Sequence, residues 1–106
     1  MTPDAAIEYI FKHGKLYAKA KAERIYLEEF RKSLKAIIMK RSYETTVNAQ
    51  EREAYSDPEY IDLLKGLKEA VETEEEIRWG LVAAQARIEA WRTESANARA
   101  EVRATL

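Results

Sequence analysis

The side chains that most often carry chemistry are sparse in this sequence. His13 is the only histidine among the 106 residues, and there is no cysteine. His13 stands beside Gly14, where a helix is expected to end, and a histidine there interacts favourably with the partial negative charge of the helix C-terminus. A transition-metal site would need further imidazole or thiolate ligands. We therefore interpret His13 as a helix-terminal residue, and expect neither a metal nor another cofactor.

Carboxylates form the second group that could do chemistry. Glu69, Glu72 and Glu76 share one face of a predicted helix, as do Asp62 and Glu69. Di-iron helical bundles present such rows, but they combine them with Glu-x-x-His pairs, and none occurs here. Glycine-rich phosphate loops, a Gly-x-Ser-x-Gly elbow and a Ser/His/Asp set are also absent from the sequence. These observations predict a solvated acidic face and a protein that is not an enzyme.

Basic side chains give the most informative pattern. Residues 12–41 carry ten Lys or Arg against three Glu, a net charge of +7, whereas residues 42–78 carry four against eleven, a net charge of −7. On a helical wheel, several cations of the basic segment gather on one side together with an aromatic ring. Cations for phosphates and a ring for stacking are what sequence-tolerant binding of single-stranded nucleic acid requires. The candidate nucleic-acid-binding residues are Tyr17, Lys21, Arg24, Arg31, Lys32 and Lys35.

The same basic stripe has a second interpretation. Its cations could pair with the acidic segment from Glu69 to Glu76, within one chain or between subunits. The isoelectric point near 5.9 favours this alternative. Sequence alone leaves both interpretations open.

The elements that would position these residues are helices. Thr2 and Pro3 are typical of a helix start, which predicts a short helix over about 3–12 that ends or kinks at His13 and Gly14. A long helix is predicted over about 15–41, because it lacks Gly and Pro and carries apolar residues three or four apart. That stripe consists of Leu16, Ala20, Leu27, Phe30, Leu34 and Ile37, with Glu23 at the one missing step.

A connector is expected over about 42–55, where β-branched and other poor helix formers gather, with Thr46 as a possible cap of a short turn. A second long helix is predicted over about 57–103. Its start is marked by Ser56 as the cap of a capping box with Glu59, or by Asp57 as the cap before Pro58. Its seam is regular and typical of a coiled coil. The seam consists of Leu63, Leu67, Ala70, Glu74, Ile77, Leu81, Ala84, Ile88, Trp91, Ser95, Ala98 and Val102.

Two glutamates interrupt these stripes, and two glycines lie within the second long helix. Glu23 and Glu74 occupy seam positions, where each either pairs with a cation such as Arg24 or Arg78, or lies at a wet edge. Gly66 and Gly80 mark a bend of the second helix or a close approach of its neighbour.

Together the elements predict an all-α fold, a single domain over 1–106 built as a long antiparallel two-helix hairpin, coiled-coil-like, with a short N-terminal helix. A second set of apolar residues lies off the seams. We expect a homo-oligomer that covers them, or alternatively coverage by Tyr9, Ile10 and Phe11. The off-seam residues are Ile25, Tyr26, Ile38, Met39, Ile61, Leu64, Val71, Trp79 and Val82.

The location is predicted to be cytoplasmic, with no membrane partner. No apolar run approaches the ~20 residues that cross a bilayer, and the first residues lack the basic and apolar regions of a signal peptide. The missing cysteines fit a reducing compartment.

Residues 16–100 resemble a known family of small helical bacteriophage proteins. The resembling parts are Leu16-Tyr17-Ala18-Lys19, the basic helix, a connector, and an acidic-to-apolar helix bearing Arg87-Ile88-Glu89-Ala90-Trp91-Arg92. Their order is similar to that of UvsY-type recombination mediators. The resemblance implies a helical oligomer that binds single-stranded DNA and helps to load a recombinase, in the cytoplasm of the host cell.

Two functions therefore follow as expectations. The first is a non-enzymatic phage-type accessory protein of DNA recombination or replication, which binds single-stranded DNA and a recombinase. The alternative is a structural or assembly module that binds another protein through exposed helix faces and binds no nucleic acid.

Overall fold

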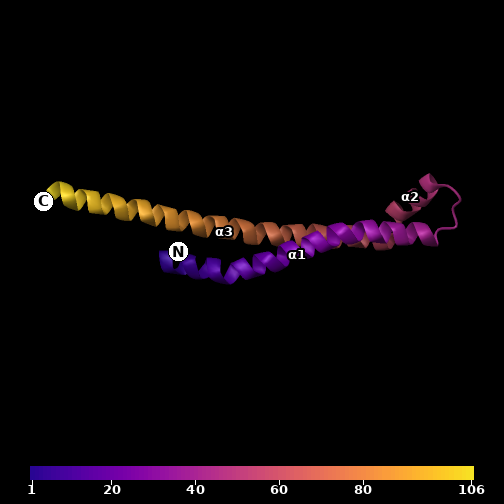
Figure 1. The fold of residues 1–106 in the computed structure, drawn as a ribbon, viewed down its shortest axis with the longest axis horizontal. Helices are drawn as coiled ribbons and strands as arrows, with labels where there is room; N and C mark the ends of the chain where they lie inside the picture. Colours follow the sequence, from indigo (N-terminus) through magenta and orange to yellow (C-terminus); the bar gives the residue numbers. More distant parts are fainter. The chain divides into compact units, whose positions relative to one another are not determined.

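The computed structural model describes all 106 residues and contains three α-helices and no strand. Helix α1 spans Pro3–Arg41, α2 spans Val47–Ser56 and α3 spans Pro58–Thr105 (Figure 1). The expected all-α hairpin of two long helices is confirmed. None of the three helices carries an apolar stretch of the length that crossing a bilayer would require.

The end of a short N-terminal helix that was expected at His13 and Gly14 is wrong. Helix α1 continues through His13 and Gly14 without interruption. The His13 ring stacks on Tyr9, with ring centroids 3.7 Å apart, and its Nδ1 lies 3.0 Å from the Tyr9 carbonyl oxygen. These local contacts occur one helical turn apart, so His13 supports the helix instead of ending it.

The connector is also more ordered than the sequence indicated, because most of it forms α2. Thr46 caps this helix: its side-chain oxygen accepts a hydrogen bond from the backbone N–H of Ala49 at 3.2 Å. Asp57 then starts α3 by accepting from the N–H of Glu59 at 2.8 Å, with Pro58 as the first helical residue. Of the two starts that the sequence allowed for this helix, the one with Asp57 as cap is confirmed.

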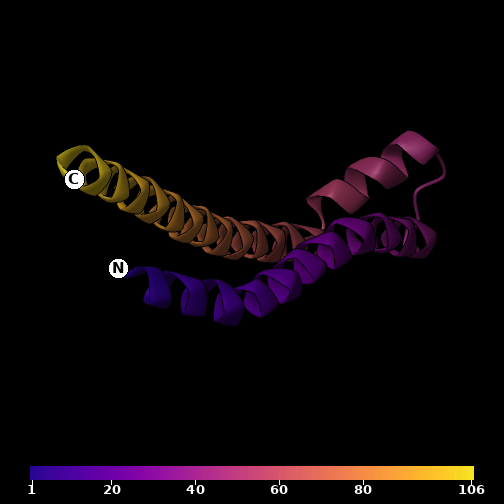
Figure 2. The ribbon, with the colours of Figure 1, turned by 60° about the vertical axis from the view of Figure 1, so that its left-hand side comes forward.

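The chain divides into two compact units, each made from parts of the long helices. One unit contains residues 1–18 and 75–106, and the other contains residues 19–74. Within the 19–74 unit the helices run antiparallel, since Arg24 pairs with Glu74 and Arg41 with Glu59. The helices of the other unit are antiparallel too (Figure 2), because Arg87 donates to the Met1 carbonyl oxygen at 2.7 Å whereas Tyr9 lies beside Gly80.

The core of the 19–74 unit lies where α2 packs beside both long helices. Its buried residues are Leu34 and Ile38 from α1, Ala54 from α2 and Tyr60 from α3. The predicted stripe placed Ile37 inward and Ile38 outward, and this is wrong: Ile38 is 3% exposed and Ile37 is 47% exposed. The stripe therefore shifts by one residue at the end of α1, where α2 adds a second packing surface. Phe30, Met39 and Leu63 pack around this core.

The two seam glutamates behave differently. Glu23 is exposed, as expected for a wet edge, whereas Glu74 is buried and paired with Arg24. Most of the predicted off-seam residues are exposed; the exceptions are Ile38 and Met39, which belong to or border the core.

Candidate nucleic-acid interface

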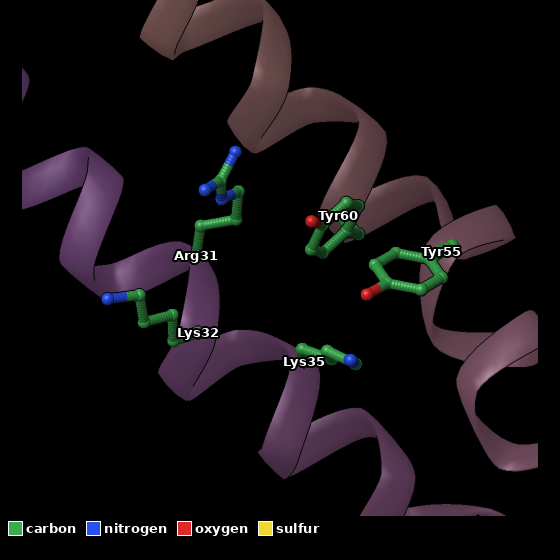
Figure 3. A pocket seen from close by; sticks show the side chains of 5 residues that line it. All are labelled: Arg31, Lys32, Lys35, Tyr55 and Tyr60. Atoms are coloured by element: carbon green, nitrogen blue, oxygen red, sulfur yellow. The ribbon is translucent and has the colours of Figure 1, made fainter.

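Three of the predicted binding residues meet two tyrosines in an open recess of the 19–74 unit. We call this the basic recess; it has a volume of about 480 Å³ and is lined by Arg31, Lys32, Lys35, Tyr55 and Tyr60. Figure 3 shows the three cations on α1, with Tyr55 and Tyr60 facing them from the other helices. A site with cations on one wall and phenol rings on the other can contact both phosphates and bases.

The core beneath the recess explains why these side chains gather. Leu34 and Ile38 turn into the core, and Arg31 and Lys35, one turn apart on α1, lie beside that buried stripe. On the opposite wall, Ala54 is fully buried and anchors α2, which places Tyr55 at the rim. Tyr60 follows the helix start at Pro58 and is itself part of the core.

Lys35 is the most constrained cation of the recess. Its Nζ lies 4.7 Å from the centroid of the Tyr55 ring and 3.4 Å from Oε1 of Glu51. The hydrogen bond with Tyr55, and secondarily the pair with Glu51, raises the pKa of Lys35 above its ordinary value. Lys35 therefore keeps its positive charge wherever an ordinary lysine does.

The two tyrosines are held edge to face, with ring centroids 5.4 Å apart and planes at 76°. This geometry is favourable for aromatic pairs and fixes the orientation of both rings. Tyr60 is buried, whereas Tyr55 is 49% exposed. Tyr55 therefore offers part of its ring to a stacking ligand.

Arg31 and Lys32 are less committed to internal partners. Arg31 is half-buried and forms no salt bridge. Lys32 lies 3.4 Å from Glu29, but both side chains are about two-thirds exposed. In Figure 3 the Lys32 side chain points away from the tyrosines, and the Arg31 side chain lies nearer to Tyr60 than to Tyr55.

Arg24 lies outside the recess and has a structural partner. Its Nε and Nη2 donate to the two carboxylate oxygens of Glu74 at 2.7 and 3.0 Å, and Nη1 donates to Glu28 at 3.1 Å. These hydrogen bonds raise the pKa of the Arg24 guanidinium. For Arg24, the alternative of pairing with the acidic segment 69–76 is therefore confirmed. Lys35 pairs instead with Glu51 of α2, outside that segment.

The two remaining predicted residues are not part of the recess. Lys21 is exposed and forms no salt bridge, and Tyr17 is half-buried and belongs to the unit of residues 1–18 and 75–106. Conversely, the sequence prediction missed Tyr55 and Tyr60. The signals that could have found them were the Thr46 cap and the Asp57-Pro58 start, which together delimit α2.

Comparison with known proteins does not assign the chain to a family. No protein-family model matches the chain, and no curated protein or solved structure is significantly similar to it. The relation to UvsY-type mediators therefore stays a prediction from the sequence, based on residues 16–19, the basic helix and residues 87–92. No group of three or more His, Asp or Glu side chains lies close enough to bind a metal ion.

Proposed function

We propose that this protein binds single-stranded nucleic acid at the basic recess, without catalysis. The observation that carries the proposal is that three cations and two tyrosines line one open recess: Arg31, Lys32, Lys35, Tyr55 and Tyr60. Phosphates would contact the cations, and a base would stack on the exposed part of Tyr55. Such contacts read the backbone and the π-face of a base, so sequence preference is expected to be weak.

The carboxylates near the recess do not prevent this binding. Glu29 and Glu51 approach their lysines only to 3.4 Å, and Glu29 is largely exposed. Exposed ion pairs contribute little to stability because water and salt screen them. A phosphate can therefore replace Glu29 as the partner of Lys32. At Lys35 a phosphate would bind beside Glu51, because an ammonium group has three donors.

The biological setting that we propose comes from the resemblance to UvsY-type mediators. It is an accessory role in phage-type DNA recombination or replication, with a recombinase as protein partner and the host cytoplasm as location. A binding protein without catalytic groups suits such a role, since its task is to hold a strand for another enzyme.

A second candidate is a module that binds a protein helix and no nucleic acid. Ile61, Leu64 and Val71 follow one another along α3 in the 19–74 unit, and each is about two-fifths exposed. Amphipathic helices of partner proteins dock on such apolar faces through residues spaced three and four apart. This candidate assigns the basic recess no ligand.

A salt titration distinguishes the two candidates. The assay measures binding of a single-stranded oligonucleotide of about 30 nucleotides, longer than the ~4–16 that one binding fold covers. Changing Arg31, Lys32 and Lys35 together to Ala should weaken binding and make the negative slope of log affinity against log salt shallower by about two. Helix content should be unchanged, because Ala is the best helix former.

The matched control removes three other cations of the same unit. Lys40, Lys65 and Lys68 are exposed, lie outside the recess and form no salt bridge. Their triple change to Ala should leave the salt slope nearly intact. Wild-type protein that does not bind the oligonucleotide at low salt would rule out the proposal. A recess variant that loses stability with no nucleic-acid affinity to lose would favour the protein-binding module.

A further inference from the structure

The C-terminal part of α3 has no helix to pack against within its unit. The Arg87 side chain hydrogen-bonds the Met1 carbonyl, so α1 begins beside this point of α3. Figures 1 and 2 both show α3 continuing past the N-terminus. Burial falls accordingly, from the buried Ala84 and half-buried Ile88 to Trp91 and Val102, which are 48% and 58% exposed.

The apolar seam nevertheless continues through this uncovered part. Trp91, Ser95, Ala98 and Val102 keep the alternating spacing of four and three residues that the buried half of the seam has. Ala98 and Val102, with Arg99 and Arg103, line a shallow recess on this surface. In heptad terms Ser95 and Val102 are a positions, and Trp91 and Ala98 are d positions. The surface therefore has the geometry of one strand of a coiled coil.

The charges beside the seam indicate what the second strand is. Arg92 and Arg99 occupy e positions, and Glu94 and Glu101 occupy g positions. In a parallel coiled coil, a g residue faces the e residue of the following heptad of the other helix, which sets Glu94 against Arg99 of a second copy. In an antiparallel pair, g faces g and e faces e, so glutamates would meet glutamates and arginines would meet arginines.

The two residues needed for the parallel pairing are uncommitted within the chain. Glu94 and Arg99 are both exposed and form no salt bridge, whereas Arg92 is paired with Glu89 at 3.0 Å. Formation of a new helix is not required either, because this segment is the end of a helix of 48 residues that is already nucleated.

We propose that residues 91–105 are a self-association surface, on which the same segment of a second copy packs in parallel and in register. Two symmetry-related pairs of Glu94 with Arg99 flank a seam of Trp91, Ser95, Ala98 and Val102. The proposal is independent of the basic recess, which lies in the other unit. Because Ser95 and Ala98 are small, the association is weak and depends on protein concentration.

The test uses charge reversal on the full chain, with the dimer dissociation constant measured by sedimentation. Glu94→Arg and Arg99→Glu should each weaken the dimer about tenfold, because two attractive pairs become repulsive. The double variant, or an equimolar mixture of the two single variants, should regain wild-type association. If Glu94→Arg strengthens the dimer, the packing is antiparallel and the proposal is wrong.

The absence of natural cysteines supplies an independent readout of which face is buried. Ala98→Cys places a thiol at a d position, where two parallel helices face each other, and mild oxidation should give a covalent dimer. Ala100→Cys is the matched control, because the same substitution two residues further lies on the opposite face and should stay monomeric. Equal cross-linking of both variants, or wild-type protein that remains monomeric up to the highest soluble concentration, overturns the proposal. If only another protein occupies this surface, the chain alone is monomeric, and the proposal fails in the same way.

Discussion

Each of the two compact units buries the apolar faces of its helices, but with side chains of different size. In the 19–74 unit, α2 adds a third helical segment, and large side chains such as Leu34, Ile38 and Tyr60 become buried. The unit of residues 1–18 and 75–106 has only two helical segments. The residues buried in it are two alanines, Ala6 and Ala84.

The difference shows what a third segment contributes. Two helices alone can shield only a narrow stripe, so close approach must come from small residues such as Ala6, Gly80 and Ala84. A third segment covers the side of the stripe, which allows large apolar residues such as Leu34 and Ile38 to leave solvent. We therefore expect the 19–74 unit to be the more sensitive of the two to loss of a side chain.

The sharpest way to break this comparison is to remove one large core side chain. Ile38→Ala should cost about 2–5 kcal/mol of unfolding free energy, as buried large-to-small changes do. Ile37→Ala is the matched control. Its side chain is half-exposed, and the change should stay within about 0.5 kcal/mol. Thermal or denaturant melts measure both values.

The outcome also tests the register at the end of α1. Equal losses for the two variants, or a larger loss for Ile37→Ala, would mean that α2 does not cover Ile38. By the same reasoning, Leu81→Ala should cost less than Ile38→Ala, because Leu81 is only half-buried in the unit without a third segment.

A smaller effect is expected from the ion pair at the edge of the 19–74 unit. Arg24→Leu removes the two hydrogen bonds that Arg24 donates to the Glu74 carboxylate, which stays shielded from water, so the melting temperature should fall. Glu74→Leu should lower it less, because Arg24 is partly exposed and keeps Glu28 as a partner. Changing both residues to Leu should recover most of the loss, since a buried ion pair replaced by apolar residues is often neutral.

A double-mutant cycle on Arg24 and Glu74 measures their coupling directly. Single variants that melt like wild type, with no coupling between them, would show that the pair is exchanged for water in solution. The 19–74 unit would then owe its stability to its apolar core alone.

Much of the helical architecture could be predicted, and the failures have identifiable causes. Apolar residues spaced three and four apart gave both long helices, because that spacing is set by the helix itself. Gly14 suggested a helix end, but one glycine costs only about 1 kcal/mol in a helix, and the stack of Tyr9 on His13 supports the turn just before it. Ile38 was wrongly predicted to be exposed. Its burial depends on packing against α2, and the spacing of apolar residues within α1 contains no information about α2.

The candidate site was only partly accessible to sequence reasoning, for the same reason. Arg31, Lys32 and Lys35 lie within two turns of one helix, so a helical wheel groups them correctly. Tyr55 and Tyr60 join them only through tertiary packing of α2 and the start of α3. Arg24 looks equivalent to the other cations on a wheel, but Glu74, which pairs with it, is fifty residues away in sequence.

The smallest expected effects on stability come from substituting the glycines of α3, one in each unit. A methyl group added at Gly66, in the 19–74 unit, would meet no atom within 4 Å. Gly66→Ala should therefore stabilise the protein by about 1 kcal/mol, through helix propensity alone. At Gly80, in the other unit, the same methyl would overlap the Tyr9 hydroxyl and lie 3.1 and 3.3 Å from two ring carbons.

Gly80→Ala should consequently lose the gain seen at Gly66, or become destabilising, because the Tyr9 ring has to move away from its stack on His13. In a Tyr9→Ala background the obstacle is gone, so Gly80→Ala should there stabilise by about the same 1 kcal/mol as Gly66→Ala. Denaturant melts of the four combinations at positions 9 and 80 give the coupling free energy. If Gly80→Ala stabilises equally with and without the Tyr9 ring, α1 and α3 do not approach closely at Gly80, and small residues are not what packs that unit.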